Sequence, residues 1–552
     1  MEISVKYIVG GVIKEEYGCE TEDYTLLCDS QNGRTTICLK SKNPIELIGA
    51  KIEENYEFES GSRLFLNGYQ SWTETREYGL SETVHNINRL PKVIKDRFHF
   101  EAYGDAWFYR YGKDRFHGFT YAYAKKKDGR TELIGSLNEA NAYLIIHYDK
   151  LENKVMLKSD CMYKQVDGEF TLFDFVRYEG EAKDVLKRYF DHFGPCNVPK
   201  VRGYTSWYLH YQDINEEKML KALEGIDSEN FDLFQIDDGY ETFVGDWMEI
   251  DEKKFPNGLK GIVDKIHAKG LKAGIWLAPF VCETKSRIYK EHPDWLYRKD
   301  GKVVFAGSNW SGDVALDLRN PEVQDYIKKC LEFYIDMGFD FFKLDFLYAA
   351  ALCAGRGGTD ISLEDSEHRK HAATRAEIMH QAMVCLREIL KDKLILGCGV
   401  PLSSAFNLVD YCRIGPDVSL IFDDVFYMRA MHRERISTKT TLLNTIFRSV
   451  MDGHVFRNDP DVFLLRDENI KLSKEQRRAL TMINHLCGSV FMTSDNVADY
   501  DESKKAVLKE AQKLTRANIN NIFTDGRIVH VEYTLDGEPG ELKYDSKNGV
   551  LI

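Results

Sequence analysis

The regular return of short apolar runs after residue 200 is the feature that most constrains this fold. Several of these runs, which are rich in β-branched and aromatic residues, are followed by amphipathic helical stretches. A strand followed by a helix, repeated eight times, is typical of a parallel (β/α)8 barrel. The sequence therefore predicts a TIM barrel over residues 199–517. The eight runs are residues 203–208, 231–235, 272–278, 339–346, 393–399, 411–415, 454–457 and 489–492.

Helix start and stop signals between the runs support this alternation. Asn320 and Pro321 supply an N-cap and a first-turn proline, and Gly338 supplies the matching stop. Asp213, with Glu216 three residues later, predicts a capping box at the start of another helix. Helices that alternate with strands cover a parallel sheet, so the predicted fold class is α/β.

The chain before and after the barrel has a different pattern. Short β-branched and aromatic runs alternate with turn signals such as Asn67-Gly68, which predicts an antiparallel β-sandwich domain over residues 1–198. Asp-Gly and Asn-Gly turns in the last stretch predict a small C-terminal β domain over residues 518–552. We therefore expect three domains, with the barrel in the middle.

Charge and composition argue against several classes of partner. Lys and Arg number 74 against 88 Asp and Glu, a formal net charge of −14, so neither nucleic acid nor an anionic membrane is expected. No basic segment followed by an apolar segment opens the chain, and no stretch reaches ~18 uninterrupted apolar residues. The 12 cysteines include no Cys-x-x-Cys pair and are expected to be free thiols. We therefore expect a cytoplasmic protein, and a homo-oligomer is compatible with the sequence.

Charged side chains stand at the ends of several apolar runs, where burial of charge requires an explanation. In a TIM barrel the catalytic groups lie at the carboxyl ends of the strands, so these residues are candidate site residues. They are Asp237 and Asp238 after the second run, Lys343 and Asp345 in the fourth, Arg413 and Asp417 at the sixth, and Asn458, Asp459 and Asp461 after the seventh.

The spacing within two of these runs predicts which side chains share a face. Residues two apart on a strand point the same way, so Lys343 and Asp345 are expected to face the barrel mouth together. A neighbouring ammonium favours the ionised carboxylate that a nucleophile requires, although a structural ion pair fits the same spacing. Arg413, Gly415 and Asp417 repeat the pattern, with room for a ligand at Gly415 and a proton donor at Asp417. A turn aspartate after proline is the alternative for Asp417.

Two carboxylates on different strands suit the cleavage of a glycosidic bond. One attacks or stabilises the anomeric centre while the other protonates the leaving oxygen. Asp237 and Asp238 are then candidates for accepting hydrogen bonds from sugar hydroxyls, and a turn or N-cap role is the alternative for either. A sugar-binding barrel without catalysis is the non-enzyme alternative. The presence of both candidate catalytic carboxylates argues against it.

A barrel metallohydrolase is the rival from another reaction class. Asp237, Asp345, Asp417 and His454 would be its ligands. Against this rival, no His-x-His pair ends a strand, and Lys343 would compete with a cation for Asp345.

A set of short segments, in order from Asn67 to Asp461, carries a resemblance to a known family. Upstream of the barrel it includes Asn67-Gly-Tyr-Gln-Ser-Trp72. In the barrel region the segments are Gln235-Ile-Asp-Asp-Gly-Tyr-Glu241, Gly245-Asp-Trp247, Gly274-Ile-Trp-Leu-Ala-Pro279, His292-Pro-Asp-Trp295, Lys343-Leu-Asp-Phe346, Leu396-Gly-Cys-Gly399 and Arg413-Ile-Gly-Pro-Asp417. Together they resemble glycoside hydrolase family 36, the α-galactosidases.

This resemblance implies roles for individual residues. Asp345 is the implied nucleophile of a retaining mechanism, and Asp417 is the implied acid/base. Asp237 and Asp238 are implied to hold the galactose 4- and 6-hydroxyls. The other implied pocket residues are Lys343, Cys398 and Arg413, with Trp276 as an apolar wall and Trp72 reaching in from the sandwich domain. No metal and no cofactor are implied.

The sequence therefore predicts a retaining glycoside hydrolase that releases terminal α-linked galactose from small α-galactosides of the melibiose and raffinose type. An α-N-acetylgalactosaminidase and an α-galactosyl transglycosylase remain alternatives, because they differ only in room around the 2-substituent and in water access. Thr205 departs from the cysteine that family members often carry there. The Gly-rich segment 354–360 fits either a lid or a long loop.

Overall fold

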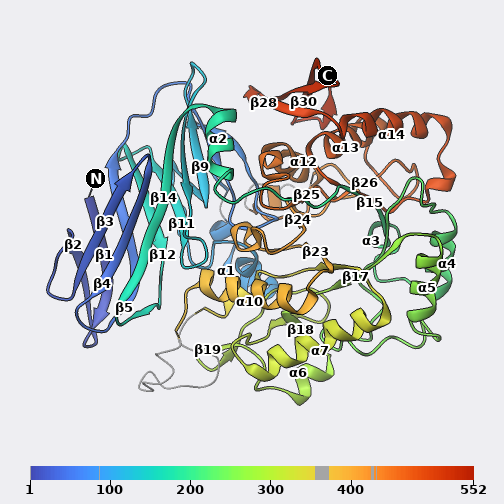
Figure 1. Cartoon of the computed structure of the whole chain (residues 1–552), viewed down its shortest axis with the longest axis horizontal. Helices are drawn as coiled ribbons and strands as arrows, with labels where there is room; N and C mark the ends of the chain where they lie inside the picture. The colour runs from blue at the N-terminus through green and yellow to red at the C-terminus, as the bar shows by residue number, and fades with distance from the viewer. Residues whose placement is uncertain (1, 86, 355–371, 424–427, 430–431) are drawn as a thin grey trace.

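The computed structural model describes residues 2–552 apart from 86, 355–371, 424–427 and 430–431. It places a β-sandwich, a barrel and a small C-terminal sheet against one another, with the sandwich at one side and the small sheet above the barrel (Figure 1). Most of the Gly-rich segment, residues 355–360, lies outside the described residues, so the choice between a lid and a loop stays open.

Two antiparallel sheets form the sandwich. Side chains from both sheets, such as Val5, Ile52, Leu39 and Phe173, form the hydrophobic core between them. The first sheet has the order β2 (Val12–Tyr17), β1 (Glu2–Val9), β5 (Ile45–Asn55), β12 (Lys154–Asp160), β11 (Tyr143–Asp149) and β8 (Arg115–Phe119), and β13 (Gln165–Val166) pairs with β5. The second has the order β3 (Tyr24–Gln31), β4 (Arg34–Ser41), β14 (Glu169–Glu181), β10 (Arg130–Ser136), β9 (Tyr121–Lys125), β6 (Arg63–Leu66) and β7 (Arg76–Gly79). Helices α1 (Lys92–Phe98) and α2 (Ala182–Phe190) complete this part of the chain.

A parallel sheet forms the barrel and closes on itself. Its strands are β15 (Val201–Thr205), β16 (Leu233–Ile236), β17 (Lys272–Leu277), β22 (Phe341–Leu344), β23 (Leu394–Gly397), β24 (Tyr411–Arg413), β25 (Arg457–Asp459), β26 (Val462–Phe463) and β27 (Val490–Thr493). β25 pairs with β24, β26 pairs with β27, and β27 pairs with β15. Because Pro460 and Asp461 alone separate β25 from β26, these two pieces form one interrupted seventh strand. The predicted (β/α)8 barrel is confirmed.

One of the eight predicted strands is misplaced. Residues 454–456 of the seventh apolar run form a turn, and the strand begins only at Arg457. Gly453, with a φ of 79°, turns the chain so that its N–H bonds to the Phe456 carbonyl. This turn uses the residues that the hydrophobic pattern had assigned to the strand.

Helices on the outside of the sheet follow the predicted alternation. α7 begins after the N-cap Asn320, whose side chain accepts from the Glu322 N–H, and ends at Gly338 with a φ of 103°. The predicted capping box at Asp213 is wrong, because the N-cap of the next helix is Asn215, and Asp213 instead binds the Lys218 ammonium at 2.6 Å. The main helices are α4 (Glu216–Glu224), α5 (Lys260–Ala268), α7 (Pro321–Met337), α10 (Arg375–Leu390), α12 (Thr438–Phe447), α13 (Lys474–Cys487) and α14 (Glu502–Leu514), and the short ones are α3 (Trp207–His210), α6 (Arg287–Glu291) and α8 (Ala349–Leu352).

The C-terminal segment is a four-stranded antiparallel sheet. Its strands are β28 (Asn518–Asp525), β29 (Ile528–Leu535), β30 (Glu538–Asp545) and β31 (Val550–Leu551). The limits of the three domains stay predictions. In the part of the chain that the structure describes, none of the helices combines the length and apolar character needed to cross a membrane.

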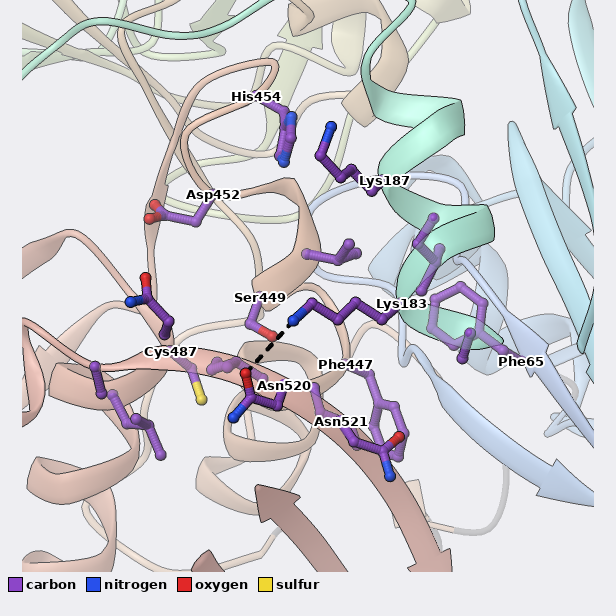
Figure 2. A pocket seen from close by; sticks show the side chains of 18 of the residues that line it. Phe65, Lys183, Lys187, Phe447, Ser449, Asp452, His454, Cys487, Asn520 and Asn521 are labelled. Atoms are coloured by element: carbon purple, nitrogen blue, oxygen red, sulfur yellow. Dashed lines mark hydrogen bonds between the residues drawn. The ribbon is translucent and has the colours of Figure 1, made fainter. Parts of the chain in front are cut away.

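A cavity of about 750 Å³ lies where the sandwich, the barrel and the C-terminal sheet meet (Figure 2). Lys183 of α2 reaches across it to Asn520 of β28, with Nζ 3.5 Å from the amide oxygen. His454 and Arg457 also line this cavity, at the amino end of β25. It therefore lies away from the carboxyl ends of the strands, where barrel enzymes carry their catalytic groups.

Candidate active site

A second cavity, of about 580 Å³, opens at the carboxyl ends of the barrel strands. Seven of the nine predicted site residues line it: Trp72, Asp237, Asp238, Trp276, Lys343, Asp345 and Asp417. The other two, Cys398 and Arg413, are buried directly behind this wall. The cavity takes its residues from both the sandwich and the barrel, so it depends on how those two parts dock.

Asp345 comes directly after β22 and faces the cavity. Its Oδ1 accepts the N–H of Phe346 at 2.8 Å, and its Oδ2 accepts the indole N–H of Trp276 at 3.2 Å. Two N–H donors hold the carboxylate in one orientation, as a nucleophile requires. Phe346 has a φ of 55°, a backbone conformation that is rare for a side chain of this size and that turns the chain away from the strand direction after Asp345.

Lys343 pairs with a different carboxylate from the one that the sequence suggested. Its Nζ lies 2.9 Å from Oδ2 of Asp237, two strands away in the sheet. Burial alone would lower the pKa of Lys343, but the Asp237 carboxylate overrides burial and raises it. Asp237 also accepts hydrogen bonds from Gln235 at 2.7 Å and from Thr205 at 3.2 Å. The predicted contact of Lys343 with Asp345 is therefore replaced by an Asp237 network at the cavity floor.

Asp238 is held by side chains that come from three other parts of the barrel. Its Oδ2 accepts from Gln212 at 3.0 Å and from the indole N–H of Trp310 at 2.9 Å. Burial and the adjacent Asp238 carboxylate raise the pKa of Glu241 well above its usual range. Burial raises the pKa of Asp238 as well, so ionisation of both carboxyl groups of this pair is disfavoured.

Asp417 shares one guanidinium with two other carboxylates. Arg413 donates to Asp417 from Nη1, to Asp459 from Nε and to Asp461 from Nη2, each at 2.8 Å. Burial, reinforced by the Asp461 charge, raises the pKa of Asp417 to about 6. A carboxyl group with such a pKa holds its proton in about half of the molecules at pH 6 and in about a tenth at pH 7, far more than an ordinary aspartate does, and a general acid requires that proton.

Trp72 enters the cavity from a loop of the sandwich that is fastened to the barrel. Its ring packs edge-on against Phe346 at 5.5 Å, and a Cβ at position 399 would lie 2.8 Å from that ring, so Gly399 permits the contact. The Ser71 N–H bonds to the Val400 carbonyl at 2.9 Å. Arg448, fully buried, donates to the carbonyls of Ser71 at 2.6 Å and Ile414 at 2.7 Å, which joins the loop to the strand end before Asp417.

The ligand set of the metallohydrolase alternative is not assembled. His454 lines the cavity at the amino end of β25 (Figure 2), whereas Asp237, Asp345 and Asp417 line the cavity at the carboxyl ends. Burial raises the pKa of the Cys398 thiol well above its usual range, which keeps this residue protonated and a poor metal ligand. Among the described residues, no three His, Cys, Asp or Glu side chains are grouped as a metal site.

Some residues of this region gave no site signal in the sequence, and for others the sequence did not indicate the contacts. Trp310 and Gln212 come from loops without a recognisable motif, so only the folded chain brings them to Asp238. Asp461 follows a barrel strand and was visible as such, but its link to Arg413 was not. Tyr208, which donates to Asp461, had no signal beyond its aromatic character.

Comparison with known proteins places this site in a family context. Residues 187–391 match the family described as Melibiase. α-Galactosidase Mel36A of Lactobacillus acidophilus is 34% identical over 130 residues, which are 22% of this chain and 17% of that protein. α-Xylosidase XylQ of Lactiplantibacillus pentosus is 30% identical over 183 residues, which are 31% of this chain and 23% of that protein. These matches span about a fifth of the length of the curated relatives.

Solved structures match over nearly the whole chain. TtGalA, an α-galactosidase from Thermus thermophilus solved with p-nitrophenyl α-D-galactopyranoside, has a TM-score of 0.69 at 24% identity, over 94% of this chain and 98% of that one. Its stachyose complex has a TM-score of 0.68 at 25% identity, over 88% of this chain and 99% of that one. The matches include a family 36 α-galactosidase. The predicted resemblance to glycoside hydrolase family 36 is confirmed.

Proposed function

We propose that this chain is a retaining α-galactosidase of glycoside hydrolase family 36 that releases terminal galactose from small α-galactosides. The main support for this proposal is that two carboxyl groups that line the same cavity have different environments. Asp345 accepts two N–H donors, whereas Asp417 has a raised pKa and accepts from Arg413. A pair of carboxyl groups that differ in this way divides into a nucleophile and an acid.

In the proposed reaction Asp345 attacks the anomeric carbon of the galactoside. The bond from that carbon to the leaving oxygen breaks, and Asp417 gives its proton to this oxygen. The product of this step is a covalent galactosyl ester on Asp345. Asp417, now ionised, removes a proton from water, and the resulting attack on the same carbon frees Asp345 and returns galactose with its original configuration.

The remaining predicted residues have binding roles in this proposal. Asp237 and Asp238 accept hydrogen bonds from the 4- and 6-hydroxyls, with Lys343 at the same floor. Trp276 gives an apolar wall for the sugar ring and Trp72 covers the entrance. Arg413 and Cys398 act from behind the wall, where Arg413 holds Asp417. No step needs a metal or a cofactor.

The substrate and location complete the proposal. The matched Thermus enzyme has been solved with p-nitrophenyl α-galactoside and with stachyose, which supports short α-galacto-oligosaccharides as substrates here. All 12 cysteines are unpaired, which suits a reducing compartment and supports a cytoplasmic location.

A panel of nitrophenyl glycosides tests the proposal. We expect cleavage of the α-galactoside in preference to the α-N-acetylgalactosaminide, the α-xyloside, the α-glucoside and the β-galactoside, with no effect of a chelator. Proton NMR of the first turnover should show α-galactose before mutarotation. Initial β-galactose would exclude a retaining mechanism, loss of activity on chelation would favour metal chemistry, and preference for another glycoside would reassign the substrate.

A further inference from the structure

We propose that Asp461 is a positioning residue for the acid Asp417: it fixes the loop that carries Asp417 and supplies the negative charge that keeps Asp417 protonated before the reaction. This inference rests on the proposed function and assigns to Asp461 a task within that reaction. Asp461 does not line the cavity wall in the way that Asp345 and Asp417 do, and it acts through its neighbours.

The backbone of Asp461 is held in an unusual conformation. Its φ of 71° lies in the left-handed region, which residues with a side chain adopt rarely. This turn interrupts the seventh strand between β25 and β26 and places the Asp461 side chain among residues of other strands. An unusual backbone conformation is retained only where surrounding contacts stabilise it, so we expect the Asp461 side chain to make such contacts.

Those contacts tie Asp461 to both sides of Asp417. Its Oδ1 accepts from Nη2 of Arg413 at 2.8 Å, and Arg413 in turn donates to Asp417. Its Oδ2 accepts the backbone N–H of Val418, the residue after Asp417, at 2.7 Å. The hydroxyl of Tyr208 donates to the same oxygen. Asp461 therefore holds the chain on which Asp417 sits as well as the side chain that binds it.

The positive charge of this cluster does not balance its carboxylates, which favours retention of a proton on one of them. Arg413 carries one positive charge, while Asp417, Asp459 and Asp461 would together carry three negative ones. The side chains of Asp459 and Asp461 are 1% exposed. Burial raises the pKa of Asp461 as well, but Arg413, the Tyr208 hydroxyl and the Val418 N–H oppose this effect by stabilising its ionised form. Asp417 is 34% exposed, lines the cavity and accepts a hydrogen bond from Arg413. The proton is therefore most stable on Asp417, where it can be passed to a substrate.

Other charges around Asp417 do not cancel this effect. Lys343 favours its ionised form, but the Lys343 ammonium is hydrogen-bonded to Asp237. Asp461 and Asp345 both raise the pKa of Asp417, and burial acts in the same direction. The charged and titratable groups that act on Asp417 or feel its charge are Arg413, Asp461, Lys343, Asp345, Tyr208, Tyr211 and Cys398.

Asp461→Asn tests the inference, because it removes the charge at nearly constant size. The measurement is the pH profile of kcat/KM on melibiose, whose leaving group needs protonation. We expect the alkaline limb to move down by about one pH unit, since a like charge this close shifts a carboxyl pKa by that order. Above the limb this displacement is about a tenfold loss on melibiose, and a dinitrophenyl α-galactoside should lose much less.

Two further variants serve as a control and as a second, independent test. Asp495→Asn is the matched control, because Asp495 is an equally buried aspartate held by Arg466 at 3.1 Å and by the Tyr500 hydroxyl at 2.7 Å. It should lower stability and leave the limb where it is. Tyr208→Phe weakens the ionised form of Asp461 and should move the limb in the same direction by less, which carries the test if Asp461→Asn does not fold.

The outcomes separate this inference from the proposed function. An active wild type with an unshifted limb in Asp461→Asn and in Tyr208→Phe would overturn the inference and leave the α-galactosidase proposal standing. A limb that shifts equally in Asp495→Asn would also overturn it, because any buried charge loss would then suffice. A wild type without α-galactosidase activity would overturn both.

Discussion

At the scale of single residues, the environments of Asp345 and Asp417 give the first prediction. Asp345→Ala removes the group that forms the covalent intermediate, so turnover should fall by several orders of magnitude. The fold should survive, because Asp345 faces the cavity. Added azide should restore part of the activity and yield β-galactosyl azide, which NMR identifies. Near-normal turnover of this variant, with or without azide, would show that Asp345 is not the nucleophile.

Asp417 gives a second prediction, which depends on the leaving group and on pH. Asp417→Ala should impair melibiose cleavage far more than cleavage of a dinitrophenyl α-galactoside, whose departure needs little protonation. In the wild type, kcat/KM on melibiose should fall as pH rises through about 6, because the acid loses its proton over that range. Equal losses on both substrates would instead mark Asp417 as a structural or binding residue.

The proposed binding of the galactose 4-hydroxyl by Asp237 and Asp238 gives a third prediction. Galactose and glucose differ only at the 4-hydroxyl, and a site that leaves a charged acceptor unpaired can discriminate by roughly 10⁴-fold. Asp238→Asn and Asp237→Asn should each narrow the preference for the nitrophenyl α-galactoside over the α-glucoside and lower kcat/KM, because hydrogen bonds to charged groups contribute about 1.5–3 kcal/mol. The ratio of kcat/KM values decides the matter, and a ratio unchanged in both variants contradicts the assignment.

Structure adds a distinction between these two aspartates. Asp237 already accepts from Lys343, Gln235 and Thr205, so its replacement also leaves the buried Lys343 ammonium without its partner. Asp238 contacts Gln212 and Trp310 at the cavity wall. We therefore expect Asp237→Asn to cost stability as well as selectivity, and Asp238→Asn to cost selectivity alone.

At the scale of elements, the loop between β6 and β7 depends on α12 and on the residue that follows it. Arg448 donates to the carbonyls of Gly68, Gln70 and Ser71, and burial lowers its pKa to about 9, which leaves it charged at neutral pH. Arg448→Met removes the donor of the Gly68 and Ser71 carbonyls, whereas the Gln70 carbonyl keeps the Thr73 N–H, and each buried group that stays unsatisfied costs about 1–3 kcal/mol. The loop should then loosen and Trp72 should move.

The fourth prediction is tested by measuring kcat, KM and the free energy of unfolding of this variant. KM should rise more than kcat falls, because the role we propose for Trp72 is to contact the substrate rather than the reacting atoms. Arg387→Met is the control: Arg387 also donates to three carbonyls, those of Leu408, Lys391 and Lys393, and lies outside the cavity. An Arg448→Met enzyme with reduced stability and wild-type KM would show that the loop holds its place without this residue.

At the scale of the whole molecule, one hydrophobic core runs through all three parts of the chain. It extends from Phe65 and Tyr121 of the sandwich, through the barrel, to Val531 and Tyr544 of the C-terminal sheet. Parts that share a core cannot unfold without exposing each other's apolar surface. The fifth prediction is therefore a single calorimetric unfolding transition for residues 1–552, and no independently stable fragment 199–517. Two resolved transitions, or a folded and soluble barrel fragment, would contradict it.

The sequence alone determined the order of the elements and the location of the candidate site. Hydrophobic runs separated by amphipathic stretches indicate parallel strands and covering helices, because burial of apolar faces is a local pattern. Charged residues at the ends of such runs, such as Asp237, Asp345 and Asp417, can also be identified from the sequence. Burying a charge at a strand end is costly, so its presence there indicates a functional or structural role. The one strand that moved, β25, did so because a glycine turn took up the predicted residues.

Only the tertiary structure decided which charged groups are partners. Lys343 lies two residues from Asp345 in sequence, yet its long side chain reaches across β17 to Asp237. Arg413 binds carboxylates of the loop that follows β24 and of the seventh strand, and Arg448 hydrogen-bonds the sandwich loop to the barrel. These pairings depend on the distances between strands, which are set when the barrel closes. Spacing along the sequence does not specify them, because electrostatic energies depend on separation in space and on burial.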